Sequence, residues 1–172
     1  GENLAPWAAF GQANQEYSPL QLANYIATLC GGGDHYATHL LKNVRSSGSG
    51  ALEYVYDAEP VERVEISSEN LSAVLAGMHD LATDGAVSQY FKDCIVDAAA
   101  KTGTIQTGDT KNNNGAFVCF APYDDPQIAV AIVIEKGGSG AALASTAVQV
   151  LNAYFSNTSA SSAITGENTL LG

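Results

Sequence analysis

Residues Ala100–Thr107 read AKTGTIQT, and this stretch decides how the rest of the chain is interpreted. Lys101 supplies a positive charge, Thr102 and Thr104 supply hydroxyl groups, and Gly103 lets a ligand approach the backbone closely. A strand built in this way can bind a carboxylate or a developing oxyanion. Taken alone, four such residues more often mark an ordinary polar strand end, so the surrounding sequence has to decide between the two interpretations.

Three strands are predicted around this stretch, over residues 98–106, 116–120 and 128–134. Short connections join them, which favours an antiparallel meander. The third strand is nearly all apolar and β-branched, so we expect it at the centre of the sheet with both faces covered. Residues 141–155 then predict an amphipathic helix that covers one face of the sheet. Its inward residues are expected to be Leu143, Ala147, Val150, Leu151, Tyr154 and Phe155.

The first helix has clear start and stop signals. Ser18 can act as the N-cap, Pro19 occupies the first helical position, and Gln21 completes a capping box. The glycines 31–33 end the helix. Its apolar stripe consists of Leu22, Ala23, Ile26, Ala27 and Cys30.

The segment that follows predicts short strands and a second helix. Residues 51–66 read as two short strands that are separated by Pro60. A helix begins at about Ser68 and is stopped by Gly85, and residues 86–91 can form one more helical turn. The apolar positions of this helix are Leu71, Val74, Leu75, Met78, Leu81 and Ala82.

The composition excludes several classes of protein. The 172 residues carry a formal net charge of −11, which repels phosphate groups and argues against nucleic-acid binding. No apolar run approaches the roughly 18 residues of a spanning helix, and no signal peptide is evident, so a soluble piece is expected. The three cysteines are widely spread, which predicts free buried thiols without a metal site. No cofactor is expected.

Several short motifs follow one another in an order that is specific in combination. The segments are Gly11–Gln12 with Ser18–Ala23 (GQ…SPLQLA), Ser68–Leu71 with Gly77–Met78 (SENL…GM), Ala100–Thr104 (AKTGT), Phe117–Pro122 (FVCFAP) and Ile128–Glu135 (IAVAIVIE). This order and spacing resemble those of the penicillin-binding protein transpeptidases. The resemblance extends from Ala9 to Phe155, nearly the whole chain.

The resemblance implies both a fold and an activity. The fold would be α/β, of the α+β type: the C-terminal part of the β-lactamase/transpeptidase-like fold, an antiparallel sheet with flanking helices. Residues 1–155 would be a partial transpeptidase domain and residues 156–172 a flexible C-terminal tail. The parent protein would be a peptidoglycan D,D-transpeptidase at the extracytoplasmic face of the bacterial membrane, anchored outside this chain. Its partners would be peptidoglycan stem peptides and β-lactams, which trap the catalytic serine as an acyl-enzyme.

The resemblance also implies roles for the residues of the AKTGT stretch. Lys101 would be catalytic, helping to bind the substrate carboxylate and to tune the proton relay. The hydroxyl groups of Thr102 and Thr104 would bind that carboxylate, and Gly103 would keep the strand open to substrate. The backbone N–H of Thr104 would be one half of the oxyanion hole. One departure is Ala100, where the family usually has glycine.

The nucleophile of the family is missing. No lysine of this chain has a serine three positions before it, so the Ser-x-x-Lys motif is absent. A Ser-x-Asn sequence occurs at 68–70, but it begins an amphipathic helix, where these residue types act as caps. In the family both motifs precede the segment that matches Gly11–Gln12. We therefore expect the serine outside this sequence and the chain to be inactive alone.

Two other functions and several weaker sites stay open. The chain can belong to another serine enzyme that recognises β-lactams, such as a β-lactamase or a sensor domain, or it can be a non-catalytic interaction module. A piece of this fold exposes a strand edge, so self-association is expected. His35 and His39 beside Asp34 suggest a metal site only weakly, and so does the polar loop 109–114 for calcium.

Overall fold

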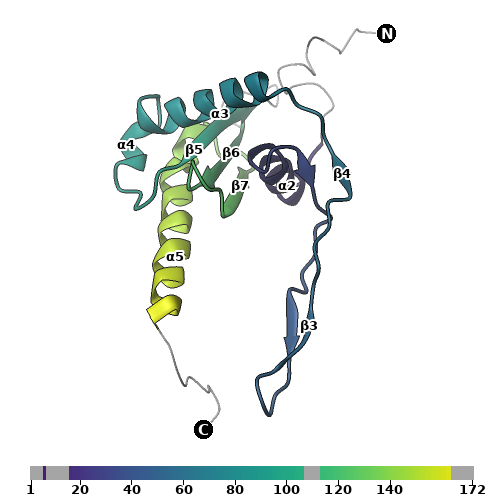
Figure 1. The fold of residues 1–172 in the computed structure, drawn as a ribbon. Helices are drawn as coiled ribbons and strands as arrows, with labels where there is room; N and C mark the ends of the chain where they lie inside the picture. Colours follow the sequence, from purple (N-terminus) through teal and green to yellow (C-terminus); the bar gives the residue numbers. More distant parts are fainter. Residues whose placement is uncertain (1–5, 7–15, 107–112, 164–172) are drawn as a thin grey trace.

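The computed structural model describes residue 6 and residues 16–106 and 113–163 of the chain (Figure 1). Its centre is a three-stranded antiparallel sheet of β5 (Ala99–Ile105), β6 (Asn114–Ala121) and β7 (Ile128–Ile134). The strand order is β5-β6-β7, which confirms the predicted meander. The segment Gly11–Gln12 and the loop 107–112 lie outside the described residues.

The prediction that residues 128–134 form the central strand is wrong. The central strand is β6, and within the described part of the chain β7 pairs only with β6. The apolar character of β7 has a different cause, because helices pack on both of its faces. These are α2 (Pro19–Cys30) on one face and α5 (Ala144–Ala163) on the other. An edge strand such as β7 can thus be apolar on both faces when helices cover both of them.

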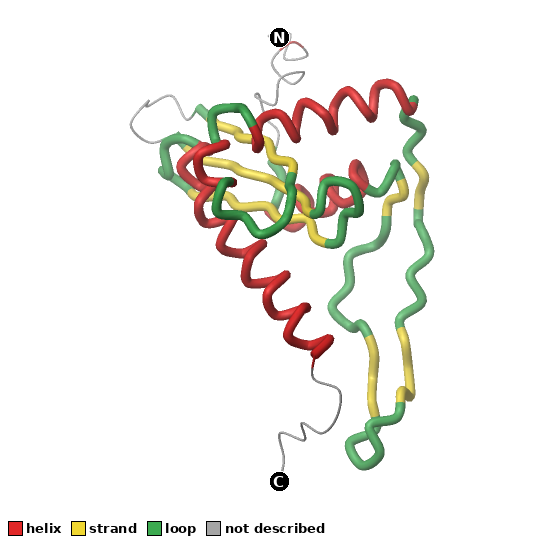
Figure 2. Tube along the Cα trace, turned by 60° about the vertical axis from the view of Figure 1, so that its left-hand side comes forward, coloured by secondary structure: helices red, strands yellow, loops and turns green. Residues whose placement is uncertain are grey.

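One face of the sheet packs against α2 and α3 (Ser68–Thr83). The side chains buried in this layer come from both helices and from β5 and β6, and they are Ile26, Leu29, Met78, Ala99 and Phe120. Figure 2 shows α3 and α5 on opposite sides of the strands. The sheet is therefore the middle layer of three.

The opposite face packs against α4 (Ser88–Phe91), the 3₁₀-helix η1 (Gly140–Leu143) and α5. This is the larger core, in which the sheet contributes Ala100, Phe117, Cys119 and Ala121 and the helices contribute Phe91, Leu143, Ala147, Leu151 and Phe155 among others. Cys119 is fully buried here, whereas Cys30 and Cys94 are half-buried, and none of the three forms a disulfide.

The first helix begins and ends where its local signals predict. The Ser18 hydroxyl accepts a hydrogen bond from the Gln21 amide at 3.2 Å, and the Gln21 side chain accepts one from the Ser18 amide at 2.9 Å. This reciprocal capping box satisfies N–H groups that the first helical turn leaves without intrahelical partners. Gly31 follows the last helical residue as the C-cap.

The second helix and the extra turn are also present. The N-cap of α3 is Ser67, whose hydroxyl accepts the Asn70 amide at 3.2 Å. Ser68 and Asn70 therefore belong to a helix start, as predicted. Of the expected apolar stripe, Met78 and Ala82 are buried, whereas Val74 is 49% exposed.

The closing helix differs from its prediction at one flank and in length. Leu143, Ala147, Leu151 and Phe155 are buried as expected, but Val150 and Tyr154 are 40% and 37% exposed. The opposite flank is buried instead, through Ala144 and Val148. Both flanks of the stripe carry apolar residues, so the sequence pattern does not indicate which of them faces the sheet. The helix also continues past Phe155 to Ala163.

A long β-hairpin projects away from the sheet, as both views show (Figures 1 and 2). It contains β2 (Asn43–Arg45) and β3 (Leu52–Val55), and every residue of β3 is exposed. At its base β1 (Asp34–His35) pairs with β4 (Glu62–Arg63). The two strands predicted within residues 51–66 are thus present. None of the described helices is long and apolar enough to cross a membrane.

Candidate functional site

The AKTGT stretch forms most of β5, at one edge of the three-stranded sheet. Ala99 and Ala100 are completely buried, whereas the next residue, Lys101, is exposed. Thr102 and Gly103 are half-buried, and Thr104 is exposed again. The strand therefore leaves the core at Lys101, the charged residue of the motif.

The two faces of β5 carry different groups. Side chains alternate along a strand, so Lys101 lies on the face that carries Ala99, whereas Thr102 and Thr104 lie on the face that carries Ala100. The Lys101 ammonium group donates a hydrogen bond to the Thr102 carbonyl oxygen at 2.6 Å. The strand thus presents one cation and two hydroxyl groups around a single edge.

Ala100 replaces the glycine that usually precedes the lysine in the resembled motif. Its methyl group is fully buried in the larger core, beside residues such as Phe117 and Cys119. The methyl group lies inside the protein and not beside the exposed Lys101. The replacement therefore leaves the solvent side of the motif unchanged.

The edge of β5 that does not face β6 carries no further strand in the described part of the chain. An edge strand offers backbone donors and acceptors to an extended ligand, as in β-strand addition. The lysine and the threonine hydroxyls at the same edge suit a ligand that ends in a carboxylate. The strand itself contains no serine.

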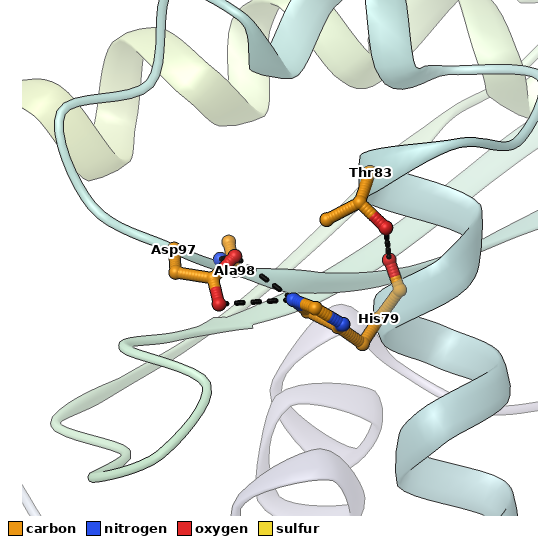
Figure 3. Close-up of polar contacts among 4 residues, drawn as sticks. All are labelled: His79, Thr83, Asp97 and Ala98. Carbon is orange, nitrogen blue, oxygen red and sulfur yellow. Dashed lines mark hydrogen bonds and ion pairs between the residues drawn. The ribbon is translucent and has the colours of Figure 1, made fainter.

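A pair that the sequence analysis did not identify lies at the start of β5. His79 of α3 places its Nε2 atom 2.9 Å from each carboxylate oxygen of Asp97 (Figure 3). The His79 ring also stacks on Tyr123 with centroids 4.2 Å apart. Asp97 also accepts a hydrogen bond from the Ala98 amide at 3.0 Å. No sequence signal joins these residues, because they are distant along the chain. The pair anchors α3 to the beginning of the motif strand.

The weaker candidate sites have ordinary structural roles. Asp34 forms an ion pair with Arg63 at 3.4 Å, and the Nδ1 atom of His35 lies 3.2 Å from the Thr28 hydroxyl. His39 stacks on Tyr56 with centroids 3.7 Å apart. Within the described ranges, no three His, Cys, Asp or Glu side chains gather in a way that could hold a metal ion.

The three thiols are held in their neutral form. Burial, with a smaller contribution from the nearby Cys94, raises the pKa of the Cys119 thiol to about 12. Burial also raises the pKa of Cys30 and of Cys94 above the usual value. Burial therefore disfavours the thiolate, which is the nucleophilic form, at all three positions.

Comparison with known families matches the chain to one family over most of its length. The model of the penicillin binding protein transpeptidase domain matches residues 3–155. Penicillin-binding protein 2A of Bacillus subtilis is 34% identical over 139 residues, which cover 73% of this chain and 19% of that protein. The peptidoglycan D,D-transpeptidase MrdA of Escherichia coli is 28% identical over 158 residues, which cover 83% of this chain and 25% of that protein.

Solved structures show the same fold. Penicillin-binding protein 2B of Streptococcus pneumoniae superposes with a TM-score of 0.76 at 24% identity, covering 98% of this chain and 29% of that one. The imipenem acyl-enzyme of penicillin-binding protein A from Mycobacterium tuberculosis has a TM-score of 0.67 at 26% identity, covering 84% and 32%. Helicobacter pylori PBP2, solved in complex with MreC, has a TM-score of 0.65 at 21% identity, covering 87% and 26%. This chain spans about a fifth to a quarter of the length of the curated relatives.

Proposed function

This chain belongs to the penicillin-binding protein transpeptidase family, and we propose that it forms one wall of the active site of a peptidoglycan D,D-transpeptidase. In this proposal residues 1–155 are the C-terminal part of the transpeptidase domain, and residues 156–163 extend its closing helix α5 and do not belong to a flexible tail. The serine nucleophile is supplied by a segment outside this sequence, because no Ser-x-x-Lys motif occurs within it.

The observation that carries the proposal is the way in which β5 leaves the core. Two buried alanines are followed at once by an exposed lysine and by a half-buried threonine and glycine, all on an edge strand. A strand that served only the core would have no reason to present a lysine and two hydroxyl groups there. The family match supports the interpretation of this edge as the substrate-binding wall.

The proposed reaction is acyl transfer through a covalent intermediate. The serine attacks the amide carbonyl between the two terminal D-alanines of a stem peptide and releases the last D-alanine. The acyl group then passes from the serine to an amine of a neighbouring strand. A β-lactam enters the same site and stays on the serine, and the imipenem acyl-enzyme of the M. tuberculosis relative supports this part of the proposal.

The residues of β5 have separate roles in this reaction. Lys101 attracts the substrate carboxylate and tunes the proton relay, whereas the Thr102 and Thr104 hydroxyls donate hydrogen bonds to that carboxylate. The two hydroxyls share a face of the strand, which allows both to reach one ligand group. Gly103 keeps the strand accessible, and the Thr104 amide supplies one donor of the oxyanion hole.

The location and the partners follow from the substrate. Stem peptides occur in the bacterial cell wall, so the proposed enzyme works at the extracytoplasmic face of the membrane. We also propose that this chain, when alone, associates with a second copy through the edge of β7 that pairs with no other strand among the described residues, where most of this apolar strand is only half-buried.

The test is acylation by a fluorescent penicillin. We expect the longer protein that contains this sequence to be labelled and the chain alone to stay unlabelled, because it lacks the serine. Lys101→Ala in the longer protein is expected to slow labelling by about 10²–10⁴-fold, which is the usual contribution of proton-transfer groups. Lys42→Ala, which removes an exposed lysine of the hairpin, is the matched control and should label at the normal rate.

Two results would contradict the proposal. One is a longer protein that carries an upstream Ser-x-x-Lys motif and still takes no label. The other is a Lys101→Ala variant that labels as fast as the Lys42→Ala control. A longer protein without any serine of this kind would instead support the alternative of a non-catalytic interaction module.

A further inference from the structure

Gly140, the first residue of η1, lies directly against the backbone of the motif strand. A methyl group built on Gly140 would overlap the carbonyl oxygens of Gly103 and Ala116 and would lie 2.8 Å from the Gly103 amide nitrogen. Gly140 is itself buried. These neighbours are backbone atoms, which cannot rotate away as a side chain would. The position therefore requires the absence of a side chain because of space.

Two hydrogen bonds donated by backbone amides hold the turn that precedes Gly140 in place. The Gly138 amide donates to the Asn113 carbonyl oxygen at 2.8 Å, and the Lys136 amide donates to the Asn114 side-chain oxygen at 2.9 Å. Asn114 is the first residue of β6 and Asn113 directly precedes it, so these bonds join the turn between β7 and η1 to the start of the central strand.

The end of the turn is held as well. The Ser139 hydroxyl accepts the Ala141 amide at 3.2 Å, and the Ser139 carbonyl oxygen accepts the Ala142 amide at 3.1 Å. The turn also lies beside Gly115 of β6, where an added methyl group would be in ordinary contact with the carbonyl group of Ser139 at 3.4 Å. Gly140 is thus fixed from both sides while it contacts Gly103.

The other face of Gly103 has no comparable backbone contact. A methyl group built on that face would meet the Ala116 side chain at 3.4 Å and the Ala116 carbonyl oxygen at 3.7 Å, and no other atom is closer. The motif strand is therefore supported at Gly103 from one side by Gly140. A side chain at position 140 would therefore press directly on the Gly103 backbone.

We propose that Gly140 is a positioning residue that sets the location of the Gly103–Thr104 backbone for substrate. The structural half of this proposal rests on the contacts alone, whereas its consequence for substrate rests on the proposed transpeptidase function. Misplacing reacting groups by about 1 Å can slow an enzyme by about 10²-fold. Gly140 would act through Gly103 and Thr104 and would not touch substrate.

The experiment compares three glycine substitutions in the longer protein that contains this chain. Gly140→Ala is expected to lower the acylation rate at saturating penicillin by about 10²-fold. Gly115→Ala adds a methyl group in ordinary contact with the Ser139 carbonyl group and the Gly140 amide of the same turn, so it should fold and lower the rate by a smaller factor. Gly85→Ala is the matched control, because its methyl group would lie 2.7 Å from the Leu81 Cα atom, in the turn after α3. It should destabilise the protein without changing acylation.

A second readout separates positioning from loss of stability. Amide resonances of Gly103 and Thr104 are measured by NMR in the chain alone, and they should shift in Gly140→Ala and Gly115→Ala but not in Gly85→Ala. Unchanged resonances in both test variants would overturn the proposal, and so would acylation that falls equally in the Gly85→Ala control. If the resonances shift but the wild-type longer protein takes no label, the proposed function fails and the structural half stands. If Gly140→Ala does not fold, the Gly115→Ala result decides in the same way.

Discussion

The imidazole of His79 lies 2.9 Å from both carboxylate oxygens of Asp97, and this contact joins α3 to the residue pair that leads into β5 (Figure 3). Asp97 holds the chain in a second way, because its carboxylate accepts the amide of Ala98, a residue that is only 3% exposed. The entry of the motif strand into the core therefore depends on one carboxylate.

Asp97→Ala should lower the free energy of unfolding by about 1–3 kcal/mol, because it leaves the Ala98 amide without its acceptor and His79 without its partner. Urea unfolding measures the loss. Asp125→Ala removes an exposed carboxylate of the β6–β7 turn and serves as the control. The His79–Asp97 pair is partly exposed, so a double-mutant cycle with His79→Ala should give a coupling of only about 0.2–1 kcal/mol. Equal losses in Asp97→Ala and Asp125→Ala would contradict this account.

Two neighbouring positions of α5 test which flank of the helix faces the sheet. Leu151 is completely buried, so Leu151→Ala should cost about 2–5 kcal/mol through lost burial and the cavity that remains. Val150 is 40% exposed, and Val150→Ala should change stability by no more than about 0.5 kcal/mol. Thermal or urea unfolding of both variants checks the difference. A large loss in Val150→Ala would restore the inward orientation that the sequence pattern suggests.

The buried thiol of Cys119 makes stability depend on alkaline pH. Its pKa is raised from 9.0 to about 12 in the folded protein, so the neutral thiol is favoured there. The corresponding stability is fully present below pH 9 and is lost as the pH rises towards about 12. Other groups also titrate in this range, so the measurement is the difference between wild type and Cys119→Ala. The wild-type free energy of unfolding should fall more steeply, by up to about 1.4 kcal/mol per pH unit.

Thiol labelling provides an independent check of the same burial. Cys119 should react more slowly with an alkylating reagent than Cys30 or Cys94, which are half-buried. All three should react alike after unfolding in urea. Rapid labelling of native Cys119 would show that the larger core is open at β6.

The edge of β7 without a partner strand in the described part of the chain predicts self-association of the chain alone. Two isoleucines at the ends of the edge strands can be compared: Ile134 of β7 is 44% exposed and Ile105 of β5 is 39% exposed. Ile134→Lys should shift the chain towards monomer in sedimentation at tens of micromolar, because an edge lysine opposes strand pairing. Ile105→Lys should leave the association unchanged. A wild-type chain that stays strictly monomeric would exclude this interface.

Features with local causes were predictable from the sequence. The bounds of α2 follow from Ser18, Pro19, Gln21 and the glycines after Cys30, because capping acts over a few residues. The motif strand β5 and its exposed lysine were predictable from their own residues and from the order of neighbouring motifs. The meander followed from the short connections between strands.

Features that depend on distant neighbours were not predictable. The apolar sequence of β7 reports burial of its faces and does not report its place in the sheet, so β6 was not recognised as the central strand. Which flank of α5 is buried depends on how the helix packs against the sheet, where Ala144 and Val148 are the buried residues. The contacts of His79 with Asp97 and of Gly140 with Gly103 join residues far apart in sequence, for which a single chain carries no pattern.

The hairpin of β2 and β3 shares no side chain with either hydrophobic core. Its turn contains Gly48, where an added methyl group would meet no atom within 4 Å. Exposed turns of this kind tolerate insertions well. A fluorescent or affinity tag placed at Gly48 would therefore leave the sheet and β5 undisturbed, and it would give the protein a handle whose position is independent of both termini.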